Sequence, residues 1–124
     1  MDTVLIIDDE WSIREVATLM LERAGYKVMS AATADDGMSM LAGNRISAVL
    51  IDVILPDKNG LELSLELNRK WPNIPIILMS GRVSTEADSI KNFNGHFGIA
   101  GSIAKPFTQE QLLASLSGAL SAAS

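Results

Sequence analysis

Short apolar runs recur along the chain at intervals that suit the strands of a sheet. A continuous apolar run of about four to eight residues is typical of a strand that is buried on both faces. One of the predicted strands carries more polar residues, and we therefore place it at an edge of the sheet. The predicted strands are Val4–Ile7, Lys27–Ala31 (the more polar one), Ile46–Asp52, Ile74–Met79 and Ile99–Ala104.

The segments between these strands carry helix signals. Ser12-x-x-Glu15 and Thr108-x-x-Gln111 match capping boxes, which are typical of helix starts. Glycine after a periodic segment indicates a helix end. Helices are expected from Ser12 to just before Gly25, over Thr33–Ala42 (capped by Thr33 or Asp35), over Leu61–Leu67, over about Ser84–Phe93, and after Thr108.

The leucine-rich segment alternates Leu with Glu and Ser, which is the period of a strand. We predict a helix there, because Leu and Glu favour helices and because a crossover must precede the next parallel strand. On a helix the leucines form two pairs on roughly opposite faces. We expect Leu63 and Leu67 to face the sheet and Leu61 and Leu65 to be largely exposed.

Alternating strands and helices predict an α/β fold with a parallel sheet covered on both faces and right-handed crossovers. The 124 residues suit one domain, 1–124. There is no cysteine, and no segment has the length and polarity of a membrane span or a leader. We expect a cytoplasmic protein without membrane insertion. The net charge of −5 argues against direct nucleic-acid binding.

Polar residues follow four of the predicted strands. Because the carboxyl ends of parallel strands meet at one edge of a sheet, we expect these side chains to lie together. Carboxylates without His or Cys suit a hard cation, Mg²⁺ above others, while a lysine and a hydroxyl suit an incoming anion. Together these are the parts of phosphoryl transfer to a carboxylate. The residues are Asp8, Asp9, Asp52, Ser80 and Lys105.

In this combination the chain resembles the receiver domain of bacterial two-component response regulators. The resemblance implies a flavodoxin-like (βα)5 doubly wound parallel sheet of order 2-1-3-4-5. It covers nearly the whole chain, in the family's order. The matching positions are the Asp8-Asp9 pair, Asp52 with Pro56 and Gly60 behind it, Ser80, and Lys105-Pro106-Phe107.

The resemblance implies a role for each position. Asp52 would be the phosphoacceptor and Lys105 its phosphoryl contact, with Ser80 closing on the phosphoryl group. Magnesium, for which Mn²⁺ can substitute, would be held directly by Asp9 and Asp52, through water by Asp8, and by the backbone carbonyl of Ile54. The Lys105-Pro106 bond is expected to be cis. Glu10 and Asp57 are interpreted as solvated charges.

Two positions depart from the family's pattern. Ser102 stands where the family usually has an aromatic switch residue, and Gly81 stands where it often has alanine. Ser102 is too small to fill or vacate an aromatic pocket. We therefore predict that phosphorylation acts by ordering or shifting about Arg82 to Gly101, a segment rich in glycine.

The leading hypothesis is a signalling switch. A histidine kinase or histidine phosphotransfer protein would donate a phosphoryl group, and a downstream protein target would recognise the modified surface. The chain would be a self-modifying phosphoacceptor, not an enzyme, with no output domain. Alternatives are a receiver excised from a larger regulator or hybrid histidine kinase, an aspartate-nucleophile phosphatase, and a flavin-binding protein. The phosphatases usually carry a second Asp two residues after the nucleophile, where this chain has Ile54.

Overall fold

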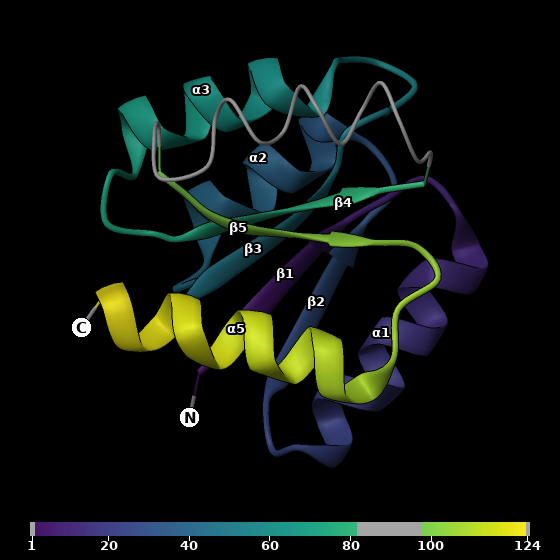
Figure 1. The fold of residues 1–124 in the computed structure, drawn as a ribbon. Helices are drawn as coiled ribbons and strands as arrows, with labels where there is room; N and C mark the ends of the chain where they lie inside the picture. Colours follow the sequence, from purple (N-terminus) through teal and green to yellow (C-terminus); the bar gives the residue numbers. More distant parts are fainter. Residues whose placement is uncertain (1, 82–97, 124) are drawn as a thin grey trace.

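The computed structural model describes residues 2–81 and 98–123, which form a parallel five-stranded sheet of order β2-β1-β3-β4-β5 (Figure 1). This confirms the predicted fold class, and it confirms that Lys27–Ala31 is an edge strand. The predicted helix over about Ser84–Phe93 lies outside the described residues. The strands are β1 (Thr3–Ile7), β2 (Lys27–Ala31), β3 (Ala48–Asp52), β4 (Ile76–Ser80) and β5 (Ile99–Ala104). The helices are α1 (Trp11–Arg23), α2 (Ala34–Gly43), α3 (Gly60–Lys70) and α5 (Gln109–Ala123).

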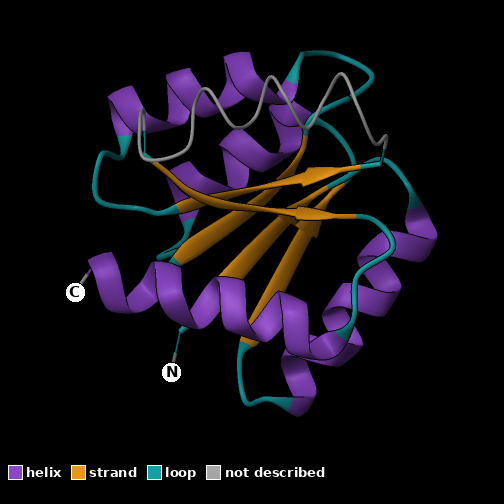
Figure 2. Ribbon diagram, viewed as in Figure 1, coloured by secondary structure: helices purple, strands orange, loops and turns teal. Residues whose placement is uncertain are grey.

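The sheet is the middle layer of three, with α2 and α3 over one face and α1 and α5 over the other (Figure 2). Successive residues of a strand point to opposite faces, so the central strands supply both layers. In β1, Leu5 and Ile7 pack with the α2–α3 layer, while Val4 and Ile6 pack with the α1–α5 layer. Burial on both faces explains why the sequence shows continuous apolar runs instead of alternation.

Helix α3 confirms the helical interpretation of the leucine-rich segment. Leu63 and Leu67 are buried against the sheet, and Leu65 is among the exposed large apolar residues at 36%. Leu61 is only partly exposed and packs on the edge of the same core, so its predicted exposure is wrong. The physical reason is that Leu61 lies in the first helical turn, close to the loop that leaves β3.

The helix starts follow the sequence signals in two of three cases. The Thr108 hydroxyl accepts from the Gln111 N–H at 3.1 Å and the Thr108 N–H donates to Gln111 Oε1 at 2.9 Å, as in a capping box. Thr33 caps α2 by accepting from the Asp36 N–H. The box predicted at Ser12 is wrong, because α1 already begins at Trp11, with an extended N-cap and no side-chain cap hydrogen bond.

None of the helices among the described residues is long and apolar enough to cross a membrane.

Candidate functional site

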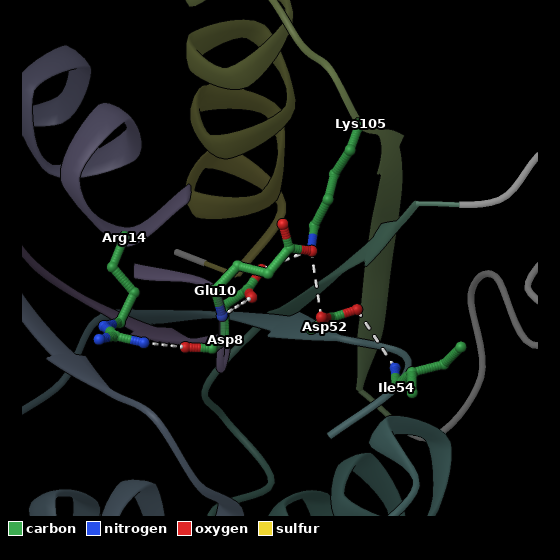
Figure 3. Close-up of polar contacts among 6 residues, drawn as sticks. All are labelled: Asp8, Glu10, Arg14, Asp52, Ile54 and Lys105. Atoms are coloured by element: carbon green, nitrogen blue, oxygen red, sulfur yellow. Dashed lines mark hydrogen bonds and ion pairs between the residues drawn. The ribbon is translucent and has the colours of Figure 1, made fainter. Parts of the chain in front are cut away.

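Asp8 continues directly from β1 and lies at the carboxyl edge of the sheet, fully buried. Its backbone N–H donates to the carbonyl of Ala31 at the end of β2, at 3.0 Å. Its carboxylate oxygen Oδ1 accepts from the Glu10 N–H at 2.9 Å, and its carbonyl accepts from Arg14 Nη1 of α1 at 2.7 Å (Figure 3). The acidic loop is therefore held by the neighbouring strand and by the helix that follows it.

Asp52 is the last residue of β3, and its residue surface is only 6% exposed. Its Oδ1 accepts from the Ile54 N–H at 3.2 Å. Helix α3 begins against the same backbone, where the Gly60 N–H donates to the Val53 carbonyl at 2.7 Å. A Cβ at Gly60 would lie 2.2 Å from the Asp52 carbonyl oxygen, so glycine is required for this close approach.

Lys105 follows β5 and reaches into the acidic group. Its ammonium lies 2.6 Å from Asp8 Oδ2, 3.1 Å from Asp52 Oδ2 and 3.5 Å from Glu10 Oε1 (Figure 3). The lysine side chain is 8% exposed. Its backbone N–H donates to the Ser80 carbonyl at 2.7 Å, which fixes the end of β5 to the end of β4. The Lys105-Pro106 peptide bond is cis, as expected.

Burial and neighbouring charges have opposing effects on the pKa values of Asp52 and Lys105. Burial, together with the negative charge of Asp8, raises the pKa of Asp52 to about 6, against the lowering effect of Lys105 and the Ile54 N–H. Burial disfavours the charged form of Lys105, but its contacts with Asp8 and Asp52 outweigh burial and raise its pKa. The lysine therefore stays an ammonium, and its single charge does not compensate the surrounding carboxylates.

The acidic group fits a divalent cation. Carboxylate oxygens of Asp8, Glu10 and Asp52 all lie within 4.8 Å of one another. Asp8 Oδ2 is buried and accepts no well-oriented hydrogen bond from any described residue, despite the nearby lysine. An acceptor of this kind, in a set of oxygen donors only, suits a hard cation.

The structure adds one residue to the predicted acidic set. Asp9 is exposed, and among the described residues its carboxylate is not grouped with those of Asp8, Glu10 and Asp52. Its role as a direct ligand stays a prediction. Glu10, interpreted from sequence as a solvated charge, lies with Asp8 and Asp52 in the acidic group. Glu10 lies two residues after Asp8, and its N–H donates to Asp8 Oδ1 at 2.9 Å, which keeps the start of α1 beside the Asp8 carboxylate. That spacing was the available signal, and it was missed.

Ser80 and Ile54 lie next to the pocket residues Lys105 and Asp52. Ser80 is buried at the end of β4, where it pairs with Ala104. Ile54 presents its backbone N–H to Asp52 and exposes its side chain. Ser102 is exposed on β5, where it lies opposite Leu78 of β4. The segment from Arg82 that was predicted to respond to phosphorylation lies outside the described residues as far as residue 97.

Fold and site together define a doubly wound α/β domain with an acidic, lysine-containing pocket at the carboxyl edge of its sheet. The model of the response regulator receiver domain family matches residues 4–117. The chain belongs to this family, the receiver domains of two-component signalling response regulators.

Similar proteins agree with this assignment. The phosphate regulon transcriptional regulatory protein PhoB of Pseudomonas aeruginosa is 32% identical over 120 residues, covering 95% of this chain and 51% of that protein. The KDP operon transcriptional regulatory protein KdpE of Escherichia coli is 35% identical over 120 residues, covering 97% of this chain and 52% of that protein. The chain thus spans about half the length of these curated relatives.

Solved structures agree as well. A CheY-like receiver domain protein from Methanospirillum hungatei JF-1 has a TM-score of 0.88 and 28% sequence identity, covering 99% of this chain and 96% of that chain. A receiver domain protein from Clostridium thermocellum, at 23% identity and a TM-score of 0.87, has the same fold.

Proposed function

We propose that Asp52 accepts a phosphoryl group from a phosphohistidine in a Mg²⁺-dependent reaction. The observation that carries this proposal is the position of the Lys105 ammonium, 2.6 Å from Asp8 and 3.1 Å from Asp52 in a buried pocket. A buried cation between two carboxylates marks a place where an anion with several oxygens can be received beside a nucleophile. This arrangement is typical of phosphoryl transfer, in which positioning and charge do most of the catalysis.

In the proposed reaction, an oxygen of the Asp52 carboxylate attacks the phosphorus atom. The bond between phosphorus and the imidazole nitrogen breaks, and its electron pair stays on that nitrogen, which leaves a histidine side chain and an aspartyl phosphate. Lys105 turns from Asp52 toward the new phosphoryl oxygens, and Ser80 offers its hydroxyl to one of them. The Ile54 N–H holds the attacking carboxylate in place.

The metal ion would be held by Asp8, Glu10 and Asp52, with Asp9 and the Ile54 carbonyl as the further donors implied by the family. Mg²⁺ is the ion proposed, with Mn²⁺ as a substitute, because the donors are all oxygens. When bound, the ion supplies positive charge that offsets the carboxylates and the incoming phosphoryl group.

A histidine kinase or histidine phosphotransfer protein is the proposed donor. The first helix carries exposed large apolar side chains, Trp11 at 67%, Val16 at 45% and Leu19 at 53%. Since α1 begins directly after Glu10, this apolar face adjoins the acidic pocket and would receive a donor protein. A downstream protein target would then recognise the phosphorylated chain. The cytoplasmic location and the status of a self-modifying phosphoacceptor, not an enzyme, are part of the same proposal.

An aspartate-nucleophile phosphatase is not favoured. Its second carboxylate would be expected two residues after Asp52, where this chain has Ile54, a residue that is 55% exposed. Direct nucleic-acid binding is not proposed, because the net charge is −5.

The proposal predicts that the chain gains one phosphoryl group from acetyl phosphate when Mg²⁺ is present, and none after chelation. Asp52→Asn should abolish the gain, because an amide is a poor nucleophile and a weaker ligand. Intact-mass measurement reports the modification. Asp36→Asn removes an exposed carboxylate from the first turn of α2 and should label normally. Labelling of Asp52→Asn at the normal rate would contradict the assignment.

A further inference from the structure

Asp57 lies in the loop between β3 and α3, yet it binds the start of a different helix. Its Oδ1 accepts from the Ala34 N–H at 3.0 Å and its Oδ2 accepts from the Asp35 N–H at 3.1 Å. These are the first two residues of α2. The first N–H groups of a helix have no partner within the helix, so Asp57 satisfies two of them from more than twenty residues away in sequence.

The loop between β3 and α3 contains both Asp57 and Ile54, whose backbone contacts the proposed phosphoacceptor Asp52. At its start, the Ile54 N–H donates to Asp52 Oδ1. At its end, the Gly60 N–H donates to Val53 and the loop is pinched by a bridge between Ile54 and Asn59. Asp57 lies in the turn between these two points, so its contact with α2 fixes the turn against a separate element.

Asp8, on the other side of the acidic group, is also hydrogen-bonded close to the start of α2. The Asp8 N–H donates to the carbonyl of Ala31 at 3.0 Å, and Ala31 precedes the start of α2 by three residues. The short connection from β2 to α2 is therefore tied to Asp8 on one side and to the loop after Asp52 on the other. These two ties act beside the direct pairing of β1 with β3, where Ile7 lies opposite Ile51.

The Asp57 contact is made by an ionised group. Asp57 is exposed, and the hydrogen bond from the Ala34 N–H lowers the pKa of its carboxyl. Hydrogen bonds that a carboxylate accepts at a helix N-terminus are charge-assisted and benefit from the helix dipole. They persist at neutral pH although solvent reaches the side chain.

We propose that Asp57 is a positioning residue for metal binding and phosphorylation: by bracing the β3–α3 loop against the N-terminus of α2, it holds Asp52 and Ile54 at the correct separation from Asp8. The inference rests on the proposed Mg²⁺-dependent function. It adds a residue that the acidic group itself does not contain.

A simple helix cap is the competing explanation, and the chain offers a matched control for it. The Thr33 hydroxyl caps the same helix through the Asp36 N–H at 3.1 Å, but it comes from the segment directly before α2 and not from the phosphoacceptor loop. Thr33→Ala therefore weakens α2 without releasing the loop. Asp57→Ala does both, and Asp57→Asn keeps an acceptor oxygen for one of the two N–H groups.

The experiment measures Mg²⁺ binding by titration calorimetry on the unsubstituted chain and on Asp57→Ala, Asp57→Asn and Thr33→Ala, after thermal unfolding shows that each is folded. We expect Asp57→Ala to weaken Mg²⁺ binding about tenfold, the low end of the effect of groups that support metal ligands indirectly. Asp57→Asn should lie between it and the unsubstituted chain, and Thr33→Ala should stay within about twofold. The rate of labelling by acetyl phosphate should fall in Asp57→Ala at low Mg²⁺ and recover at saturating Mg²⁺.

A metal-free readout completes the test. Without Mg²⁺, amide hydrogen exchange at Ile54 and Gly60 should be faster in Asp57→Ala than in Thr33→Ala. Equal Mg²⁺ affinity in Asp57→Ala and the unsubstituted chain would overturn the inference and leave the proposed function standing. Equal weakening in Asp57→Ala and Thr33→Ala would show that Asp57 is only a cap. No Mg²⁺ binding by the unsubstituted chain would overturn the proposed function and this inference together.

Discussion

Asp52 lies where ionisation is unfavourable. In the absence of metal, burial and the charge of Asp8 hold its pKa at about 6, compared with 3.8 for the ordinary side chain. Between these two values the folded chain binds more protons than the unfolded chain. The contribution of Asp52 to stability is therefore fully present below about pH 4 and is lost as the pH rises through 6. The carboxylate of Asp52, the proposed phosphoacceptor, carries a cost in stability that a bound cation would remove.

Replacing Asp52 by Asn should accordingly stabilise the metal-free chain at pH 7.5, by on the order of 1–3 kcal/mol. The gain should shrink as the pH falls below 6 and vanish well below pH 4, where Asp52 is neutral in both the folded and the unfolded state. Urea unfolding in the presence of a chelator, at several pH values, measures this. Asp36→Asn, at an exposed site, serves as the control. A destabilised Asp52→Asn protein at neutral pH would mean that Lys105 already compensates the charge.

Helix α3 forms although the spacing of its leucines is typical of a strand. Its leucines alternate as in a strand, but the helix starts with Asn59, whose side chain accepts from the Leu61 N–H at 2.7 Å. The helix then turns Leu63 and Leu67 onto the core and leaves Leu65 at the surface. Helix propensity and the need for a crossover outweigh the two-residue period.

Leu63→Ala should lower the free energy of unfolding by about 2–5 kcal/mol, because it leaves a cavity in a fully buried place. Leu65→Ala should change it by about 0.5 kcal/mol, as is usual for exposed sites. Chemical denaturation of the two variants under identical conditions makes the comparison, and Leu61→Ala should fall between them. Losses of equal size at Leu63 and Leu65 would contradict the orientation of α3.

At the scale of the whole molecule, the site is assembled from segments far apart in sequence. Lys105 meets Asp52 across 53 residues and Glu10 across 95. These groups come together because β1, β3 and β5 run parallel and end at one edge. Binding of a cation at that edge therefore joins several loops and stabilises the folded state as a whole.

Mg²⁺ at a hundredfold excess over its dissociation constant should raise the free energy of unfolding by about 2.7 kcal/mol. The midpoint temperature of thermal unfolding should therefore rise with Mg²⁺ concentration. The chelator should reverse the effect, and Asp52→Asn should show much less of it. Differential scanning calorimetry at constant ionic strength, with NaCl replacing MgCl₂ in the control, separates binding from screening. An equal shift with NaCl would argue against a specific metal site.

The sequence by itself determined the five strands, the parallel α/β class and the proximity of Asp8, Asp52 and Lys105, which the structure brings together. Apolar runs mark strands, and parallel strands end at a common edge, so both conclusions need only local patterns and one topological rule. The strand order came from the resemblance, since hydrophobic pattern does not say which strands are neighbours.

Only the tertiary structure decided how the site is built in detail. It brought Glu10 into the acidic group, and it joined Asp57 to the start of α2. Both outcomes depend on the path of loops, where a change of one backbone angle moves a carboxylate by several ångströms. Strand ends are located by hydrogen bonds along the whole sheet, whereas the direction of a loop side chain is settled by contacts with elements distant in sequence.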